Sequence, residues 1–226
     1  FPVIFELPQK HFSWERLSMH TRVVLSTTFA LLLFGTLLLK LTENISWLGA
    51  FFYSVSARTA GFSTYNLGDF STAGLLVVSG LMFIGASPAS TGGGIKTTTF
   101  FVLLSGIYSA ATNHSERAFH SAIPKDAFRK ASVISMLAVF LVMTASYLML
   151  IFDPQLSLRD VLFEMISAFS TSGLSTGITP QLSAPSRILS ILMMYIGRLG
   201  PLTVASLWYF TIGERVRYPE GTIAIG

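Results

Sequence analysis

Four long apolar stretches dominate the sequence and indicate helices that cross a membrane. They run from about Val23 to Leu41, Thr72 to Ala111, Ala131 to Phe152 and Ile188 to Ile212. A helix needs about 20 apolar residues to cross the hydrocarbon core of a bilayer. Only 12% of the residues are charged, whereas soluble domains average about 25%. We therefore expect an all-α membrane protein.

Two shorter segments, Ser46–Ala57 and Ser157–Ser170, also have helical character but are too short to span the bilayer. Asn44 or Ser46, and Ser157, are candidate N-caps, because these side chains accept hydrogen bonds from the first turn of a helix. The order is then span, short helix, span, connector, span, short helix, span. We expect both short helices to enter the membrane from the outer side.

The basic residues orient these segments, because lysine and arginine gather on the cytoplasmic side of membrane proteins. Most of them fall where one side of the membrane is expected: Lys10, Arg16, Arg22, Arg117, Lys125, Arg129, Lys130, Arg215 and Arg217. Lys96 and Arg198 remain inside apolar segments, where an ionisable residue is a candidate for function.

The sequence repeats itself at an offset of 112 residues. Thr59–Thr64, Thr-Ala-Gly-Phe-Ser-Thr, matches Thr171–Thr176, Thr-Ser-Gly-Leu-Ser-Thr, and Leu81–Gly85 matches Met193–Gly197 without a gap. Each repeat holds two spans, so both copies have the same orientation and are related by an axis along the membrane normal. Two tandem repeats of span, pore helix, filter and span are therefore predicted.

A short glycine-containing segment follows each short helix and is the predicted ion filter. Non-helical backbone at membrane depth lines a cavity or is buried in protein, and carbonyl oxygens there can replace the hydration shell of a cation. The predicted filter residues are Thr59, Ala60, Gly61, Phe62, Thr171, Ser172, Gly173 and Leu174. The alternative is that Gly61 and Gly173 only end helices as C-caps. Two units make half of a four-unit ring, so we expect the others upstream of Phe1 or in a second copy.

The second apolar stretch is interrupted at Gly85–Phe100, Gly-Ala-Ser-Pro-Ala-Ser-Thr-Gly-Gly-Gly-Ile-Lys-Thr-Thr-Thr-Phe. A phosphate-binding loop is disfavoured, because Ile95 separates Gly94 from Lys96 and the motif requires these two residue types to be adjacent. Each glycine costs a helix about 1 kcal/mol relative to alanine, and Pro88 removes a helical hydrogen bond. The segment is either a movable break in the helix or a static kink.

The motifs at Ser56–Phe62, Gly85–Lys96 and Gly197–Thr203, together with the tail Tyr218–Gly226, closely resemble the Ktr/Trk/HKT superfamily of potassium transporters. Within it, the chain is most similar to the Ktr membrane subunit (KtrB type). The resemblance implies repeats three and four of a four-repeat potassium channel-like pore, with one filter glycine in each repeat. Residues 1–112 would be the third repeat, 113–130 a cytoplasmic connector, 131–212 the fourth repeat and 213–226 a C-terminal tail.

The same resemblance implies that an intramembrane loop at residues 86–95 gates the pore. Arg198 takes the place of Ala86 at the repeat offset, and it is expected near the loop. The implied gate residues are Ala86, Ser87, Pro88, Ala89, Ser90, Thr91, Gly92, Gly93, Gly94, Lys96 and Arg198. Two alternatives remain open: Arg198 pairs with Glu164 or with backbone carbonyls, and Lys96 only extends toward the cytoplasmic boundary.

The connector, Thr112–Lys130, is expected to form a helix–loop–helix hairpin or a solvated linker. The resemblance implies a multi-pass protein of the bacterial plasma membrane that forms a homodimer, with the C-terminal tail at the dimer contact. It also implies a cytoplasmic RCK-type ring that binds the regulatory nucleotide. This chain would bind no cofactor and no nucleic acid; K+ is the transported ion, and Na+ dependence is a property of Ktr systems.

Three other functions are alternatives to a Ktr-type potassium pore. A Trk-type or Na+-permeable member of the superfamily would differ in repeats that lie outside this chain. A nonconducting scaffold for the cytoplasmic ring would share the fold. An enzyme is disfavoured, because the chain has no cysteine, no paired carboxylates and no nucleophile–base pair at a useful spacing.

Overall fold

A computed structural model describes residues 14–88, 90, 92–112, 117–119 and 121–200, and the single residues 3, 6, 8 and 203. Three short 3-10 helices lie at Trp14–Arg16, Leu67–Asp69 and Thr179–Gln181. The remaining elements are α2 (Met19–Thr42), α3 (Trp47–Ser56), α4 (Thr72–Phe83), α5 (Thr97–Thr112), β1 (Arg117–Ala118), β2 (Ser121–Ala122), α6 (Lys125–Phe152), α7 (Leu158–Ser170) and α8 (Ala184–Leu199).

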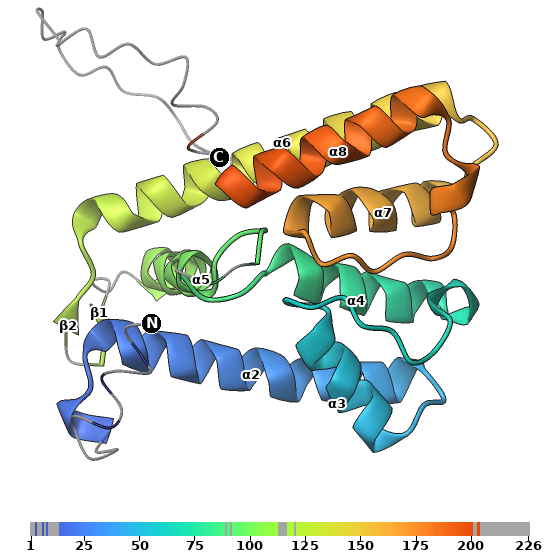
Figure 1. Cartoon of the computed structure of the whole chain (residues 1–226). Helices are drawn as coiled ribbons and strands as arrows, with labels where there is room; N and C mark the ends of the chain where they lie inside the picture. The colour runs from blue at the N-terminus through green and yellow to red at the C-terminus, as the bar shows by residue number, and fades with distance from the viewer. Residues whose placement is uncertain are drawn as a thin grey trace, which may run out of the picture.

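The helices pack as two units of the same order, α2–α3–α4/α5 and α6–α7–α8. In Figure 1, α4 and α7 lie side by side in the middle, with α2 and α3 on one side and α6 and α8 on the other. Helix α5 is seen end-on whereas α4 lies in the plane of the view, so the chain changes direction between them. The contact between α4 and α7 joins the two repeats.

The predicted spans are confirmed for α2 and α6, which are the two described helices long and apolar enough to cross a membrane. The second apolar stretch is broken into α4 and α5, as expected from its glycines and proline. Helix α8 begins earlier than predicted, at Ala184, and most of the predicted span beyond Gly200 lies outside the described residues.

Both short helices were placed correctly, and their caps are serines. The Ser46 hydroxyl accepts from the Gly49 N–H at 3.0 Å, and the Ser157 hydroxyl accepts from the Asp160 N–H at 3.2 Å. Asn44, the other candidate, is not the N-cap.

The helix–loop–helix prediction for the connector is wrong for the residues that the structure describes. Strands β1 and β2 pair there in an antiparallel ribbon, with Arg117 opposite Ala122. Phe119 turns the ribbon at φ +47° and stacks on Phe101 of α5, with ring centroids 6.4 Å apart. Pro124 is the N-cap of α6, which begins at Lys125, six residues before the expected start of the fourth repeat at residue 131. Aromatic packing beneath α5 thus outweighs the helical propensity of the connector.

The two repeats share their core. Phe163 and Leu174 of the second repeat are buried in the cluster around Tyr53 and Met82 of the first. Ile95, the last residue of the intramembrane loop, is buried in the cluster of the second repeat. Since each cluster needs side chains from the other repeat, we expect the two repeats to fold together.

Gly35 on α2 and Gly80 on α4 provide a matched test of this packing. A Cβ on Gly35 would lie 2.5 Å from the Ser54 hydroxyl oxygen and 2.8 Å from a methyl of Leu81, whereas a Cβ on Gly80 would meet nothing within 4 Å. We expect Gly35→Ala to destabilise the protein by about 1–3 kcal/mol through overpacking. Gly80→Ala should stabilise it by up to about 1 kcal/mol through helix propensity. Thermal unfolding in detergent measures both, and equal shifts would contradict the packing.

Asp153 joins the end of α6 to the start of α8. Its carboxylate accepts from the Ser183 N–H at 3.1 Å and from the Ser183 hydroxyl at 3.0 Å. Hydrogen bonds from Ser186 first, then from Ser183 and Gln155, lower the pKa of Asp153 below its ordinary value.

A pKa that is lower in the folded state means that Asp153 stabilises the fold above its unfolded-state pKa of about 4. That contribution is lost as the pH falls through the lower, folded-state pKa. We expect the thermal midpoint to drop on acidification below about pH 4, and Asp153→Asn to make the drop shallower. An unchanged acid dependence in the variant would show that other carboxylates cause it.

Candidate functional site

The two predicted filter segments, Thr59–Phe62 and Thr171–Leu174, meet near the centre of the structure. Gly61 has φ +66° and Gly173 has φ +86°, a region that favours glycine. A Cβ on Gly61 would overlap the carbonyl oxygen of Ser172. The segments therefore approach each other backbone to backbone, and Gly61 is required both by its dihedral angle and by the space available.

Each filter segment is held to the last turn of its short helix. In the first repeat, the Gly61 N–H donates to the Ser56 carbonyl at 3.0 Å, and the Ser56 hydroxyl donates to the Phe62 carbonyl at 2.7 Å. In the second, the Ser172 N–H donates to the Ser167 carbonyl at 3.2 Å, after Thr171 has turned to φ +53°. These N–H groups thus point back toward the helices.

Most carbonyl groups of the filter segments accept no hydrogen bond within the described part of the chain. None of the described residues donates a hydrogen bond to the carbonyls of the following residues: Thr59, Ala60, Gly61, Thr171, Ser172 and Gly173. Of these residues, Ser172 is buried, Gly61 and Thr171 are half-buried, and the other three are exposed. Carbonyl oxygens without a donor from the protein are suited to coordinate a cation.

The side chains of the predicted filter differ between the repeats. Phe62 is 69% exposed, whereas its counterpart Leu174 is 2% exposed and packs in the first repeat's cluster. Ser172 is buried, and its hydroxyl donates to the Met82 sulfur at 2.9 Å. The repeats are therefore alike in backbone and different in side-chain packing.

The intramembrane loop, residues 86–95, lies directly against the ends of α3 and α7. The Gly93 N–H donates to the Ser170 carbonyl and the Thr171 hydroxyl, both at 3.0 Å. The Arg58 guanidinium donates to the Gly85 carbonyl at 3.3 Å, just before the loop. The Ile95 N–H donates to the Phe83 carbonyl at 3.0 Å and brings the two ends of the loop together. The loop is thus bonded to the start of a filter segment.

The loop glycines have a role that the sequence did not reveal. A Cβ on Gly93 would lie 2.8 Å from the Phe169 carbonyl and 2.9 Å from the Ser170 carbonyl. A Cβ on Gly92 would lie 3.3 Å from the Arg58 carbonyl. Weak helix propensity was the expected reason for these glycines. The structure adds a second reason, because Gly93 lets the loop backbone approach α7 closely.

The two charged gate candidates, Lys96 and Arg198, differ in burial and in hydrogen bonding to the loop. Lys96 is half-buried, and its ammonium donates to the Gly92 carbonyl within the loop. Arg198 is exposed on α8; it makes no hydrogen bond to the loop residues that the structure describes, although its charge acts on Lys96 through space. Glu164 accepts from the hydroxyls of Ser175 and Thr179, and these bonds take the place of the alternative pairing with Arg198.

The remaining gate residues differ in burial. Ala86 and Gly94 are buried, Ser87 and Pro88 are half-buried, and Ser90 is exposed. Ala89 and Thr91 lie outside the described residues, as does the predicted tail at 213–226.

The buried Arg58 is the residue that sequence reasoning missed. It stands in the motif Ser56–Phe62 but was assigned no role, although an arginine beside an apolar pore helix is an available signal. The described residues contain no group of three or more histidine, cysteine or acidic side chains that could hold a metal ion.

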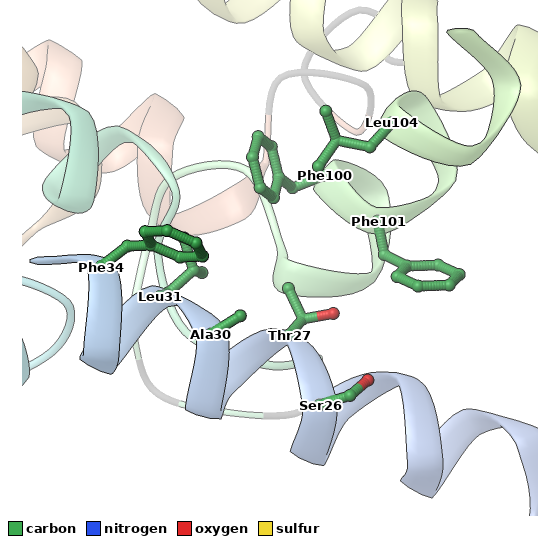
Figure 2. Close-up of a pocket in the computed structure, with 8 residues that line it drawn as sticks. All are labelled: Ser26, Thr27, Ala30, Leu31, Phe34, Phe100, Phe101 and Leu104. Atoms are coloured by element: carbon green, nitrogen blue, oxygen red, sulfur yellow. The ribbon is translucent and has the colours of Figure 1, made fainter. Parts of the chain in front are cut away.

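An apolar groove of about 470 Å³ lies between α2 and the start of α5 (Figure 2). In Figure 2, Leu31 and Phe34 of α2 lie across from Phe100 of α5. The Ser26 hydroxyl at one end donates to the Arg22 carbonyl at 2.8 Å. Apart from Ser26 and Thr27, the groove is lined by apolar side chains, which offer a cation no ligands.

This architecture is that of a family of cation transport proteins. The family model TrkH, described as "Cation transport protein", matches residues 16–211, and the chain therefore belongs to this family. A crystal structure of the potassium transporter TrkH from Vibrio parahaemolyticus has the same fold, with a TM-score of 0.73 at 17% identity. The match covers 92% of this chain and 48% of that one.

Curated relatives are similar over nearly the whole chain. Ktr system potassium uptake protein B of Vibrio alginolyticus is 38% identical over 93% of this chain and 49% of that protein. Ktr system potassium uptake protein D of Bacillus subtilis is 34% identical over 100% of this chain and 54% of that protein. The potassium/sodium uptake protein NtpJ of Enterococcus hirae is 31% identical over 94% and 51%. The chain spans about half the length of these relatives.

Gly61 and Gly177 test the close approach of the filter segments. Both have positive φ, but a Cβ on Gly177, which lies outside the filter, would meet nothing within 4 Å. Backbone strain alone should cost each alanine variant about 1–3 kcal/mol. We expect Gly61→Ala to cost clearly more than Gly177→Ala in thermal unfolding, because only Gly61 abuts the Ser172 carbonyl. Equal losses would argue against the backbone contact.

Proposed function

We propose that this chain forms half of the pore of a Ktr-type potassium uptake protein. K+ would pass down its electrochemical gradient between the filter segments Thr59–Phe62 and Thr171–Leu174. The observation that carries this proposal is the set of unpaired carbonyls at residues 59–61 and 171–173, each set ending at a glycine with positive φ. Membership of a cation transport family and the names of the relatives support the same conclusion.

The intramembrane loop is the proposed gate. Its Gly93 is bonded to Ser170 and Thr171, at the point where α7 gives way to the filter. Motion of the loop would therefore break bonds at the filter itself. Lys96 would hold the loop closed through the Gly92 carbonyl, and Arg198 would add a positive charge that raises the barrier to a cation.

The remaining assignments extend the proposal to the whole protein. The other half of the ring would come from two further repeats, which fits relatives about twice as long as this chain. The phrase "Ktr system" in their names supports a system of several components. We propose a homodimer in the bacterial plasma membrane with an RCK-type ring that binds nucleotide, and Na+ as an activator.

A second candidate function is uptake of both potassium and sodium. The similarity to NtpJ, named a potassium/sodium uptake protein, favours it. The measured K+/Na+ selectivity would decide between the two candidates. A nonconducting scaffold predicts no flux of either ion.

The deciding experiment is ion uptake by proteoliposomes that contain the full-length parent protein. We expect selective K+ flux, lost or made nonselective by Gly61→Asp or Gly173→Asp because the carboxylate disrupts the filter. Deletion of residues 87–93 should raise the flux severalfold, because a closed loop obstructs the path. Gly80→Ala, which lies on α4 and away from the filter segments, is the control and should leave the K+ flux unchanged. Wild-type flux in the deletion would reduce the loop to a static kink.

A further inference from the structure

The serine two residues after each filter glycine is bound to its own pore helix in both repeats. Ser63 and Ser175 occupy matching positions of the repeated hexamer. Ser63 is bonded to Tyr53 of α3, and Ser175 is bonded to Glu164 of α7. Tyr53 and Glu164 are neighbours when the repeats are superposed by sequence, one position apart at the offset of 112.

We call each of these contacts between a pore helix and the serine after the filter glycine a clamp. The first clamp is the phenol of Tyr53. Its hydroxyl donates to the Tyr65 carbonyl at 2.7 Å and shares a hydrogen bond with the Ser63 hydroxyl at 2.9 Å. It also accepts from the N–H groups of Thr64 at 3.2 Å and Tyr65 at 2.9 Å. The Tyr53 side chain is fully buried. One neutral group therefore fixes the three residues that lead away from the first filter segment.

The second clamp is the carboxylate of Glu164, which is 9% exposed. One of its oxygens accepts from the Ser175 hydroxyl and, at 2.9 Å, from the Thr179 hydroxyl. The Ser175 hydroxyl in turn accepts from the Gly177 N–H at 2.9 Å. A charged acceptor forms stronger hydrogen bonds than a neutral one. The second filter segment is thus tied down by a different chemistry at the same depth.

Both repeats therefore have a clamp, but the pore-helix residue that forms it is tyrosine in the first repeat and glutamate in the second. We propose that Tyr53 and Glu164 are positioning residues that hold the two filter segments at the carbonyl geometry that distinguishes K+ from Na+. The inference rests on the proposed function, because it assigns these two residues a part in the same filter. Neither side chain was a candidate site residue from the sequence.

The physical argument is the snug-fit account of selectivity, in which carbonyl ligands discriminate between cations because their positions are restrained. Each filter segment is held on one side by the last turn of its helix, through Ser56 in the first repeat and Ser167 in the second. The clamps restrain the other side. Loss of a clamp should leave the pathway open. The filter carbonyl oxygens can then move closer together and coordinate the smaller ion, Na+.

The test measures K+ and Na+ uptake by the full-length parent protein in proteoliposomes. Tyr53→Phe removes one hydroxyl and keeps the ring. Glu164→Leu removes the carboxylate at similar volume, and the Ser175 and Thr179 hydroxyls, 2.9 Å apart, can still bond each other. Glu164→Gln keeps an acceptor oxygen without the charge. We expect Tyr53→Phe and Glu164→Leu each to lower the K+/Na+ uptake ratio about tenfold, with Glu164→Gln between Leu and wild type.

Two variants control for the loss of a tyrosine hydroxyl and of an outer carboxylate. Tyr147→Phe alters a tyrosine that is 66% exposed on α6, and Asp69→Asn alters an exposed carboxylate on the outer side. Both should keep the wild-type ratio. Thermal unfolding and gel filtration establish that each variant is folded, and Tyr53→Phe and Glu164→Gln carry the test if Glu164→Leu does not fold.

Each result has a distinct meaning. A reduced ratio with retained K+ flux in folded variants supports the clamps, since a purely structural role would lower flux of both ions together. A wild-type ratio in folded Tyr53→Phe and Glu164→Gln overturns the inference and leaves the proposed function intact. Absence of K+ flux in the wild-type parent would overturn the proposed function, and this inference with it.

Discussion

The backbone contact between Gly61 and Ser172 brings the two repeats together at the centre of the structure. A side chain at Gly61 would separate the filter segments. Helices α4 and α7 pack against each other between the two repeats and form a second contact. The hydrophobic clusters support this contact, because Phe163, Leu174 and Ile95 each cross into the core of the other repeat. The site and the core of the protein are thus built by the same approach of two backbones.

Polar groups near this contact fall into two sets. Several N–H groups near this contact are paired with helix ends: those of Thr59, Ala60, Gly61, Thr171, Ser172 and Gly93. The hydroxyls of Ser56, Ser63 and Ser175 are paired as well. Six filter carbonyls accept nothing from the described residues: those of Thr59, Ala60, Gly61, Thr171, Ser172 and Gly173. Pairing these donors while sparing these acceptors leaves partial negative charge on the filter carbonyls. That arrangement suits a cation and would repel an anion.

The loop is bound to the filter by few bonds, and this suits a gate. Gly93 makes two hydrogen bonds to Ser170 and Thr171, and Arg58 makes one to Gly85. Each bond contributes on the order of 1 kcal/mol, so a movement that breaks them is accessible to a regulated protein. The close approach of Gly93 to the Phe169 carbonyl restricts the position of the loop, because a side chain on Gly93 would push the loop away from α7.

Periodicity and spacing in the sequence were sufficient to predict the helices, the break between α4 and α5, the repeat and the special backbone conformation of Gly61 and Gly173. That these glycines belong to an ion filter stays a prediction. These features are local: apolar length decides a span, and a glycine inside a repeated hexamer marks a non-helical segment. The connector was mispredicted, because Phe119 found an aromatic partner on α5 that no local pattern contains. The gate was predicted as a segment, but the bonds from Arg58 and Gly93 join residues far apart in the chain.

The sequence alone therefore determined what the protein is made of: long apolar helices, two copies of one helical unit, and a break in one helix. Tertiary structure decided how those parts meet. Which carbonyls stay unpaired, which glycines are needed for contact, and that Tyr53 and Glu164 hold equivalent serines all depend on distances between separate segments. Packing of the whole chain sets those distances, and they cannot be predicted from the residue types along a single segment.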